Sequence, residues 1–256
     1  MSTEEDLRLA ATKLREAGSI AAEEEAERLV EAAGGAAPRL RELLARRCSG
    51  EPLAWLVGST SFCGETVLVH PGVYVPRPQS ERLALRAVAR LPERGLAVDL
   101  CTGSGAVAVV LKRRRPLARV VAAEIDPLAV ACAEANGIEV YLGDMAAGVP
   151  RRMRNLVDVV TAVVPYVPTA ELRLLPRDVV AYEPHRALDG GEDGTTLLKR
   201  AALEARPLLR PGGSLLLELG GDEAGLLRPQ LIENGYRDFE LLFDEEGDLR
   251  GLSCCR

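Results

Sequence analysis

A glycine-rich turn followed by an acidic residue is the pattern in this 256-residue chain that most directly indicates chemistry. Residues 98–105 read Val-Asp-Leu-Cys-Thr-Gly-Ser-Gly, and the apolar segment 120–124 then ends in Glu124. Gly103 and Gly105 carry no side chain, so the backbone can approach a ligand closely at the turn. Glu124 is placed to accept hydrogen bonds from ribose hydroxyls. The pattern predicts a site for a nucleoside-bearing cofactor.

The form of the turn narrows the choice of cofactor. It is Asp-x-x-x-Gly-x-Gly, from Asp99 to Gly105, and Cys101 stands where a first glycine would be expected. The Gly-x-Gly-x-x-Gly turn of dinucleotide enzymes is absent, because Val109 or a neighbour occupies the place of its third glycine. An NAD-dependent dehydrogenase is therefore disfavoured. The turn resembles the S-adenosylmethionine-binding turn of Rossmann-like methyltransferases, although an ordinary strand-to-helix turn is the alternative for the glycines taken alone.

Several further segments form an ordered set of motifs. The set as a whole is more specific than any single segment in it. They are residues 50–58 (Gly-Glu-Pro-Leu-Ala-Trp-Leu-Val-Gly), 62–64, 75–81 (Val-Pro-Arg-Pro-Gln-Ser-Glu), 182–188 (Tyr-Glu-Pro-His-Arg-Ala-Leu), 190–195 and 209–220. With the glycine turn and Glu124, this set resembles the glutamine N5-methyltransferases that modify the Gly-Gly-Gln motif of peptide-chain release factors (the HemK/PrmC type). The resemblance spans nearly the whole chain. It implies a class I Rossmann-like fold, S-adenosylmethionine as cofactor, and a protein substrate, with release factors as candidates.

One motif departs from that family. The family carries Asn-Pro-Pro-Tyr after its fourth strand, where the Asn side chain and the first Pro carbonyl hold the substrate amide nitrogen. The matching positions here are Val163, Val164, Pro165 and Tyr166. Val163 has no side-chain acceptor, whereas Val164 keeps a carbonyl and Tyr166 keeps a ring that can pack on a planar group. Loss of one oriented acceptor typically costs about 3 kcal/mol of transition-state stabilisation, or about 10²-fold in rate.

The resemblance also implies individual site residues. Those expected to bind the cofactor are Asp99, Cys101, Thr102, Gly103, Gly105, Glu124, Ile125, Asp144 and Val163. Asp144 matches an acid that contacts the adenine amino group, although Gly143-Asp144 is also an ordinary turn. Arg77 and Glu183 are candidate substrate contacts, with a surface arginine and a structural carboxylate as the alternatives. Cys101 is expected to be a small packed side chain, and the alternative is a thiol whose pKa is lowered by the nearby helix N-terminus.

Composition limits the remaining classes of function. The net charge of −6 argues against a broad nucleic-acid-binding surface, so no direct nucleic-acid partner is expected. No apolar stretch approaches the ~20 residues that span a bilayer, and the acidic start of the chain is unlike a signal peptide. These features predict a cytoplasmic protein without a membrane partner. Six scattered cysteines and two histidines give no metal-binding spacing, so no metal is expected.

Hydrophobic periodicity predicts how the chain is organised. Residues 1–60 read as a helical substrate-recognition domain, 61–84 as a β-hairpin and linker, and 85–256 as a Rossmann-like domain. The hairpin is predicted from strands 66–69 and 73–75 around a turn at 70–72, and Ser80 is suited to cap the helix that follows. Substrate is expected in the cleft between the helical and Rossmann-like domains.

From residue 96 strands and helices alternate, which predicts an α/β fold with a seven-stranded, mostly parallel sheet. The strands are expected at residues 96–100, 119–124, 139–142, 157–163, 214–219, 238–243 and 249–254. Helices are expected at residues 106–112, 127–136, 195–209 and 222–234. The last two strands have no helix between them, which indicates an antiparallel hairpin at the sheet edge.

The leading hypothesis is an S-adenosylmethionine-dependent methyltransferase related to the glutamine N5-methyltransferases. A diverged methyltransferase acting on another protein or a small molecule is the alternative among enzymes. A catalytically silent homologue that binds cofactor or a partner is the alternative of another class. Val163 is the residue that keeps these alternatives open.

Overall fold

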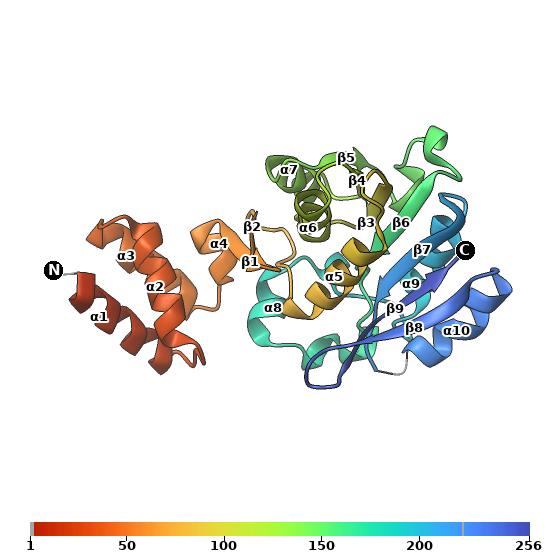
Figure 1. Cartoon of the computed structure of the whole chain (residues 1–256). Helices are drawn as coiled ribbons and strands as arrows, with labels where there is room; N and C mark the ends of the chain where they lie inside the picture. The colour runs from red at the N-terminus through yellow and green to blue at the C-terminus, as the bar shows by residue number, and fades with distance from the viewer. Residues whose placement is uncertain (1–2, 222) are drawn as a thin grey trace.

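The computed structural model describes residues 3–221 and 223–256, and the helical start of the chain stands apart from a large α/β body (Figure 1). The first helices are α1 (Thr3–Glu16), α2 (Ala22–Ala33), α3 (Ala37–Cys48) and the short α4 (Leu53–Val57). Their apolar faces form a separate core around Leu14, Leu29 and Leu43, all of which are buried. This bundle therefore has its own hydrophobic interior, as its amphipathic spacing predicts.

The α/β body is built on a seven-stranded sheet with the order β5-β4-β3-β6-β7-β9-β8. Its strands are β3 (Leu96–Leu100), β4 (Arg119–Glu124), β5 (Glu139–Leu142), β6 (Val157–Ala162), β7 (Leu209–Glu218), β8 (Arg237–Phe243) and β9 (Leu249–Cys255). The first five pair in parallel, and β9 pairs antiparallel with both β7 and β8. The predicted fold class and the antiparallel hairpin at the sheet edge are confirmed.

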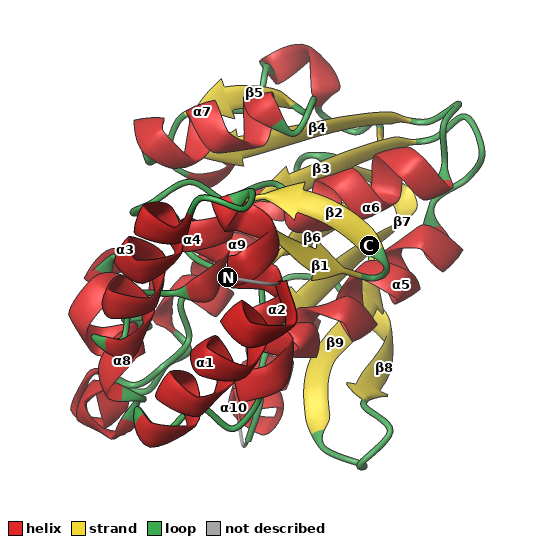
Figure 2. Cartoon of the chain, turned by 90° about the vertical axis from the view of Figure 1, so that its left-hand side faces the viewer, coloured by secondary structure: helices red, strands yellow, loops and turns green. Residues whose placement is uncertain are grey.

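Helices cover both faces of this sheet (Figure 2). They are α5 (Glu81–Arg90), α6 (Ala106–Arg114), α7 (Pro127–Ala135), α9 (Thr196–Ala205) and α10 (Glu223–Glu233), whereas α8 (Arg177–Tyr182) lies in the segment between β6 and α9. Short 3₁₀ turns lie at Pro78–Ser80, Met145–Ala147, Arg151–Met153, Thr169–Leu174 and His185–Ala187. Alternate strand residues face two cores, with Leu215 and Leu217 towards α9 and α10, and Leu216 towards α5 and α6. This period of two is what a sheet buried on both faces requires.

Element ends differ from the sequence prediction at a few places. Strand β7 begins at Leu209 rather than at residue 214, because Leu209 already pairs with Val157 ahead of a shift in register. Helix α9 ends at Ala205 rather than at 209, since Pro207 follows closely and cannot continue a helix. The predicted start of the last helix at residue 222 lies outside the described residues.

The hairpin prediction is wrong in its position. The two strands are β1 (Ser59–Phe62) and β2 (Glu65–Leu68), and the turn between them is Cys63-Gly64, where both residues have positive φ. Residues 73–75 form no strand. Their backbone groups instead contact side chains: the Val73 carbonyl accepts from Trp55 Nε1, and the Val75 amide donates to Glu183. These tertiary contacts satisfy the polar groups that a strand partner would otherwise bind.

The prediction that Ser80 caps a helix is also wrong. Ser80 has helical backbone angles, and its side chain makes no capping hydrogen bond to α5. It is buried instead, where its hydroxyl lies beside the carboxylate of Glu218. Ser80 thus has the residue type of a helix cap, but it lies among the buried groups at the carboxyl end of β7.

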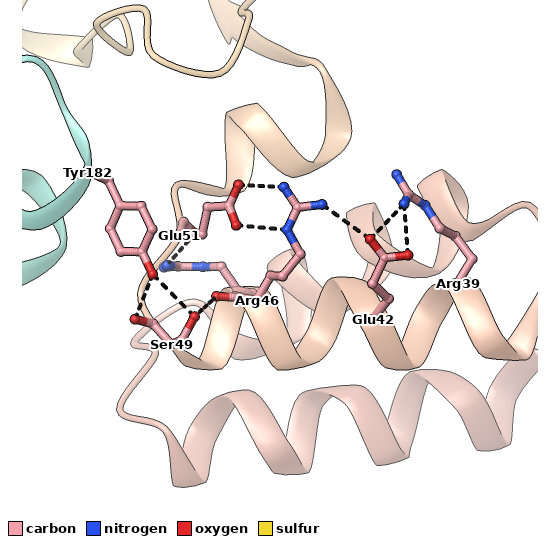
Figure 3. A network of polar contacts seen from close by, with 7 residues as sticks. Arg39, Glu42, Arg46, Ser49, Glu51 and Tyr182 are labelled. Atoms are coloured by element: carbon pink, nitrogen blue, oxygen red, sulfur yellow. Dashed lines mark hydrogen bonds and ion pairs between the residues drawn. The ribbon is translucent and has the colours of Figure 1, made fainter.

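Contacts with Tyr182 help to join the N-terminal helices to the rest of the chain, and Figure 3 shows the one that Ser49 makes. Ser49, which follows α3, lies 3.2 Å through its hydroxyl from the Tyr182 hydroxyl at the end of α8. The ring of Trp55 meets the ring of Tyr182 edge-on, with centroids 6.4 Å apart. In the same network, Arg46 donates two hydrogen bonds to Glu51 at 2.8 and 2.6 Å, which fixes the segment between α3 and α4.

Replacing Trp55 with Phe tests how far this junction stabilises the fold. The variant keeps an aromatic ring but removes the Nε1–H donor and leaves the Val73 carbonyl without it. We expect the free energy of unfolding to fall by about 1–3 kcal/mol, the usual cost of a buried group left unpaired. Urea denaturation followed by circular dichroism is suited to the measurement, because Trp55 is the chain's one tryptophan. Ile20→Val, at a fully exposed position, is the control, and equal loss in both variants would contradict the prediction.

Candidate functional site

A cavity of about 760 Å³ opens at the carboxyl ends of β3, β4, β6 and β7. That volume is within the ~300–1,000 Å³ range of small-molecule sites, and the edge is where open α/β sheets bind ligands. Ten of the residues singled out from the sequence line it: Arg77, Cys101, Gly103, Glu124, Ile125, Asp144, Val163, Val164, Pro165 and Tyr166. The cavity is not lined by Asp99, Thr102, Gly105 or Glu183. The contacts of these four residues place them behind the residues that form the cavity wall.

The carboxylate of Glu124 is held in place by the backbone. Its Oε2 accepts from the Gly103 amide at 2.9 Å, and its Oε1 accepts from the amides of Ile125 and Asp126 at 2.9 and 3.0 Å. Each carboxylate oxygen has further lone pairs that can accept a ligand hydroxyl. Gly103 has φ +57°, and the space beside its Cα is open, so backbone and ligand can approach closely there. The residues present therefore fit a ribose-bearing cofactor.

Asp99 lies beneath the turn. Its oxygens accept hydrogen bonds from the hydroxyls of Thr102 at 2.5 Å and Thr161 at 2.6 Å. Burial raises the pKa of Asp99 to about 6, although both hydroxyls oppose the rise. Asp99 and Thr102 thus tie the turn to β6. Gly105, with φ +85°, begins α6, and a Cβ there would lie 3.1 Å from the Cβ of Ala133.

Cys101 adopts the left-handed backbone conformation that a glycine would hold, with φ +55°. This is consistent with its place in the turn, and it adds strain that glycine would not have. The alternative, in which the helix N-terminus lowers the pKa of this thiol, is wrong. Burial, reinforced by the nearby carboxylates of Glu124 and Asp99, raises the pKa of Cys101 to about 12. Burial therefore outweighs the effect of the helix N-terminus on the pKa of Cys101, and the thiol stays protonated.

The residues after β6 form the opposite part of the cavity from Glu124. Val164 is buried, and the Tyr166 hydroxyl donates to Glu218 Oε1 at 3.1 Å. Gly190 packs directly on this segment, since a Cβ there would lie 2.5 Å from the Tyr166 Cα. The backbone of Pro165 and Tyr166 is therefore clamped by the loop that follows α8.

Arg77 and Glu183 form an ion pair at the cavity wall. Glu183 is nearly inaccessible, and it accepts from the Val75 amide as well as from Arg77. The guanidinium of Arg77 lies 5.0 Å from the centre of the Tyr74 ring, in cation–π contact. Glu183 therefore orients Arg77, and Arg77 is the member of the pair that reaches the cavity.

Asp144 faces the cavity with a partner that the sequence did not suggest. Arg200, on α9, lies 2.8 Å from the Asp144 carboxylate and also bonds Glu204 at 2.7 Å. Further lining residues were missed, and the carboxylates Asp126 and Glu218 are among them. Asp126 caps α7 through the Leu128 amide. A cap signal before Pro127 could have identified Asp126, whereas only the strand pairing places Glu218 at this edge.

The cavity does not lie between the N-terminal helices and the α/β body, contrary to the sequence prediction. Its lining begins at Gly72, so no residue of the first 60 contributes to it. The bundle contacts Tyr182 instead, and the segments on both sides of Tyr182 carry lining residues, from Leu175 to Leu188. Within the described part of the chain, no helix is long and apolar enough to cross a membrane, and no cluster of three or more potential ligands could hold a metal.

Comparison with known proteins places this site in a class. No protein-family model matches the chain. The fold matches a methyltransferase from Pyrococcus furiosus (TM-score 0.54, 21% identity, 74% of this chain and 88% of that chain). It also matches a ribosomal protein L11 methylase from Lactobacillus delbrueckii (TM-score 0.52, 19% identity, 75% of this chain and 86% of that one). The sheet order, the glycine turn and the paired acid define a class I S-adenosylmethionine-dependent methyltransferase.

Sequence relatives identify the family. The chain is 36% identical over 211 residues to a release factor glutamine methyltransferase from Geobacter sulfurreducens, covering 81% of this chain and 74% of the relative. It is 37% identical over 199 residues to a 4-amino-L-phenylalanine/4-methylamino-L-phenylalanine methyltransferase from Streptomyces pristinaespiralis, covering 73% of this chain and 68% of the relative. The chain belongs to the release factor glutamine methyltransferase family, as its ordered motifs predict.

Glu124→Ala is expected to weaken binding of S-adenosylhomocysteine by about 1–3 kcal/mol, because it removes a preoriented acceptor and leaves ligand hydroxyls unpaired. Isothermal titration calorimetry measures the change. Glu139→Ala is the matched control, since Glu139 lies on the neighbouring strand β5 and pairs with Arg119 outside the cavity. Equal affinity of the Glu124 variant and the wild-type protein would contradict the predicted ribose contact.

Proposed function

We propose that the chain transfers a methyl group from S-adenosylmethionine to a nitrogen atom held against residues 163–166. The observation that carries the proposal is that one cavity contains both Glu124, beside the glycine turn, and the segment Val163–Tyr166. When bound, the cofactor supplies an electrophilic methyl group on a sulfonium sulfur. Asp144 and Ile125 would contact its adenosine part, and Glu124 its ribose. Asp99 and Thr102 would support this site through the backbone of the turn.

Catalysis in this arrangement is mainly positioning. The Val164 carbonyl is a candidate acceptor for a substrate N–H, and the ring of Tyr166 is a candidate surface for a planar group. The hydrogen bond from Tyr166 to Glu218 and the packing of Gly190 hold that segment in one geometry. Arg77, fixed by Glu183, would meet a carbonyl or carboxylate of the substrate.

The first candidate substrate is the glutamine side chain of a Gly-Gly-Gln release-factor domain. Family membership and the 36% identity to a release factor glutamine methyltransferase support it. The N-terminal region, residues 1–60, is then the part we assign to protein recognition, with residues 61–84 as the connection to the catalytic domain 85–256. The contact of the bundle with Tyr182 links it to the loops that line the cavity. We further propose a cytoplasmic location, and the net charge of −6 favours a protein that makes no direct contact with nucleic acid.

The second candidate substrate is the amino group of a small molecule or of another protein side chain. Val163 favours this candidate, because a neutral amine carries its own reactive lone pair and does not need the two acceptors that align a carboxamide. The 37% identity to a methyltransferase named for 4-amino-L-phenylalanine shows that a relative of similar closeness acts on an amine. Both candidates use the same cofactor site. They differ in whether the methyl acceptor needs the side-chain hydrogen-bond acceptor that Val163 lacks.

The double variant Val163→Asn with Val164→Pro separates the two candidates. It restores the family motif, so methylation of a Gly-Gly-Gln release-factor domain should rise, by up to the ~10²-fold expected for one oriented acceptor. Mass spectrometry of the acceptor after incubation with labelled S-adenosylmethionine measures the gain. Affinity for S-adenosylhomocysteine should stay unchanged and serves as the control.

Strong glutamine methylation by the wild-type protein would show that the lost acceptor is not needed. Methylation of 4-amino-L-phenylalanine by the wild-type chain alone would favour the amine candidate. No transfer to either acceptor by either form would contradict the proposed function and favour a silent homologue.

A further inference from the structure

Tyr74 lines the cavity and belongs to none of the ordered motifs, since the segment 75–81 begins directly after it. The guanidinium of Arg77 lies 5.0 Å from the centre of its ring. No described residue accepts a hydrogen bond from the Tyr74 hydroxyl, yet the hydroxyl oxygen is not one of the side-chain atoms that are fully buried without a partner. The hydroxyl therefore keeps accessible surface in the cavity wall and has a proton to donate there.

The backbone on both sides of Tyr74 is fixed by side chains from other segments. The Val73 carbonyl accepts from Trp55 Nε1 at 2.9 Å, and the Val75 amide donates to Glu183 Oε2 at 3.3 Å. Val73 is itself buried. These contacts hold Tyr74 at the cavity wall before a ligand arrives, so little conformational entropy is lost when its hydroxyl binds one.

Tyr74 belongs to the part of the cavity that the segment Val163–Tyr166 forms. A negative charge on Tyr74 would raise the pKa of Tyr166, which places the two phenols close together. Burial raises the pKa of Tyr74 to about 12, and the positive charge of Arg77 opposes that rise. The Tyr74 phenol therefore stays neutral at physiological pH and keeps its proton. It is a hydrogen-bond donor in the part of the cavity assigned to the methyl acceptor.

Arg77 offers further donors next to this hydroxyl. Its ion pair with Glu183 uses Nη2, and a guanidinium has five N–H groups, so other donors of Arg77 remain for a ligand. A phenol and a guanidinium side by side suit an oxygen with free lone pairs, such as an amide carbonyl or a carboxylate. The pair therefore recognises an oxygen of the methyl acceptor rather than its reacting nitrogen.

We propose that the Tyr74 hydroxyl donates a hydrogen bond to a carbonyl or carboxylate oxygen of the methyl acceptor, beside Arg77. This rests on the proposed function, and it makes Tyr74 a residue that determines which acceptors bind. Both kinds of candidate offer such an oxygen: the glutamine side chain has an amide carbonyl, and a free amino acid such as 4-amino-L-phenylalanine has a carboxylate. An amine without such an oxygen binds more weakly.

Tyr74→Phe tests the assignment, because it removes the hydroxyl and keeps the ring that contacts Arg77. The probes are 4-amino-L-phenylalanine and 4-(2-aminoethyl)aniline, which is the same molecule without its carboxylate. Each is titrated calorimetrically into protein saturated with S-adenosylhomocysteine. The wild-type protein should prefer the amino acid, and the variant should lose about three- to tenfold of that preference, as expected for one hydrogen bond. Affinity for S-adenosylhomocysteine should change less than about twofold.

A second arm uses a Gly-Gly-Gln release-factor domain as the acceptor in a methyl-transfer assay. Tyr74→Phe should raise KM for the domain by about three- to tenfold. The value of kcat should change less than about threefold, because the hydroxyl holds the carbonyl oxygen and not the reacting nitrogen. An effect with the amino acid alone identifies a carboxylate as the group that Tyr74 binds, and an effect with the domain alone identifies an amide carbonyl.

Tyr236→Phe is the matched control, since it removes a phenol hydroxyl outside the cavity. The Tyr236 hydroxyl is buried and donates to the Ala202 carbonyl at 2.7 Å. Its loss should lower the melting temperature without changing the preference between the two probes or KM for the domain. Tyr74→Phe should show the reverse pattern, because the Tyr74 hydroxyl donates to no acceptor within the described part of the protein.

The outcomes separate the two proposals. If the wild-type protein methylates either acceptor and Tyr74→Phe keeps its preference and its KM, the assignment of Tyr74 is overturned and the proposed function stands. If the amino acid binds with a preference that depends on Tyr74 but nothing is methylated, the proposed function fails and the assignment stands. Equal loss of affinity for both probes and for S-adenosylhomocysteine, with a lower melting temperature, gives Tyr74 a structural role and overturns the assignment. If neither acceptor binds, both proposals fail.

Discussion

The parallel pairing of β3, β4, β6 and β7 is the constraint on which the rest of the site depends. It brings the carboxyl ends of these strands to one edge, so residues far apart in the sequence meet there: the glycine turn, Glu124, Val163 and Glu218. The hydrogen bonds from the Thr102 and Thr161 hydroxyls to Asp99 tie the turn to β6, and three backbone amides fix Glu124. A rigid edge of this kind can position a cofactor and an acceptor without movement of the sheet.

Buried carboxylates at that edge differ in how their oxygens are satisfied. Both oxygens of Asp99 accept hydroxyl protons, and both oxygens of Glu124 accept backbone amides. Glu218 accepts from the Tyr166 hydroxyl through Oε1, the Ser80 hydroxyl lies beside its carboxylate, and burial raises its pKa. The cost of burying a carboxylate is offset where its lone pairs accept hydrogen bonds, and the Glu124 oxygens keep further lone pairs for a ligand hydroxyl.

Much of this arrangement could be predicted from the sequence, because strand and helix periods, glycine turns and ordered motifs are local signals. The sheet, the turn and the cavity segment Val163–Tyr166 were identified in this way. Other features depend on contacts distant in the sequence. Residues 73–75 have strand composition but bond Trp55 and Glu183, Ser80 has cap composition but lies against Glu218, and burial overrides the helix terminus at Cys101. The place of Glu218 beside Val163 required the strand order and register.

The structure of the protein with S-adenosylhomocysteine bound is the most direct test of this account. The account predicts that the ribose hydroxyls bond the Glu124 carboxylate and that the sulfur faces the segment Val163–Tyr166. A ligand bound elsewhere, or one whose sulfur points away from this segment, would contradict it.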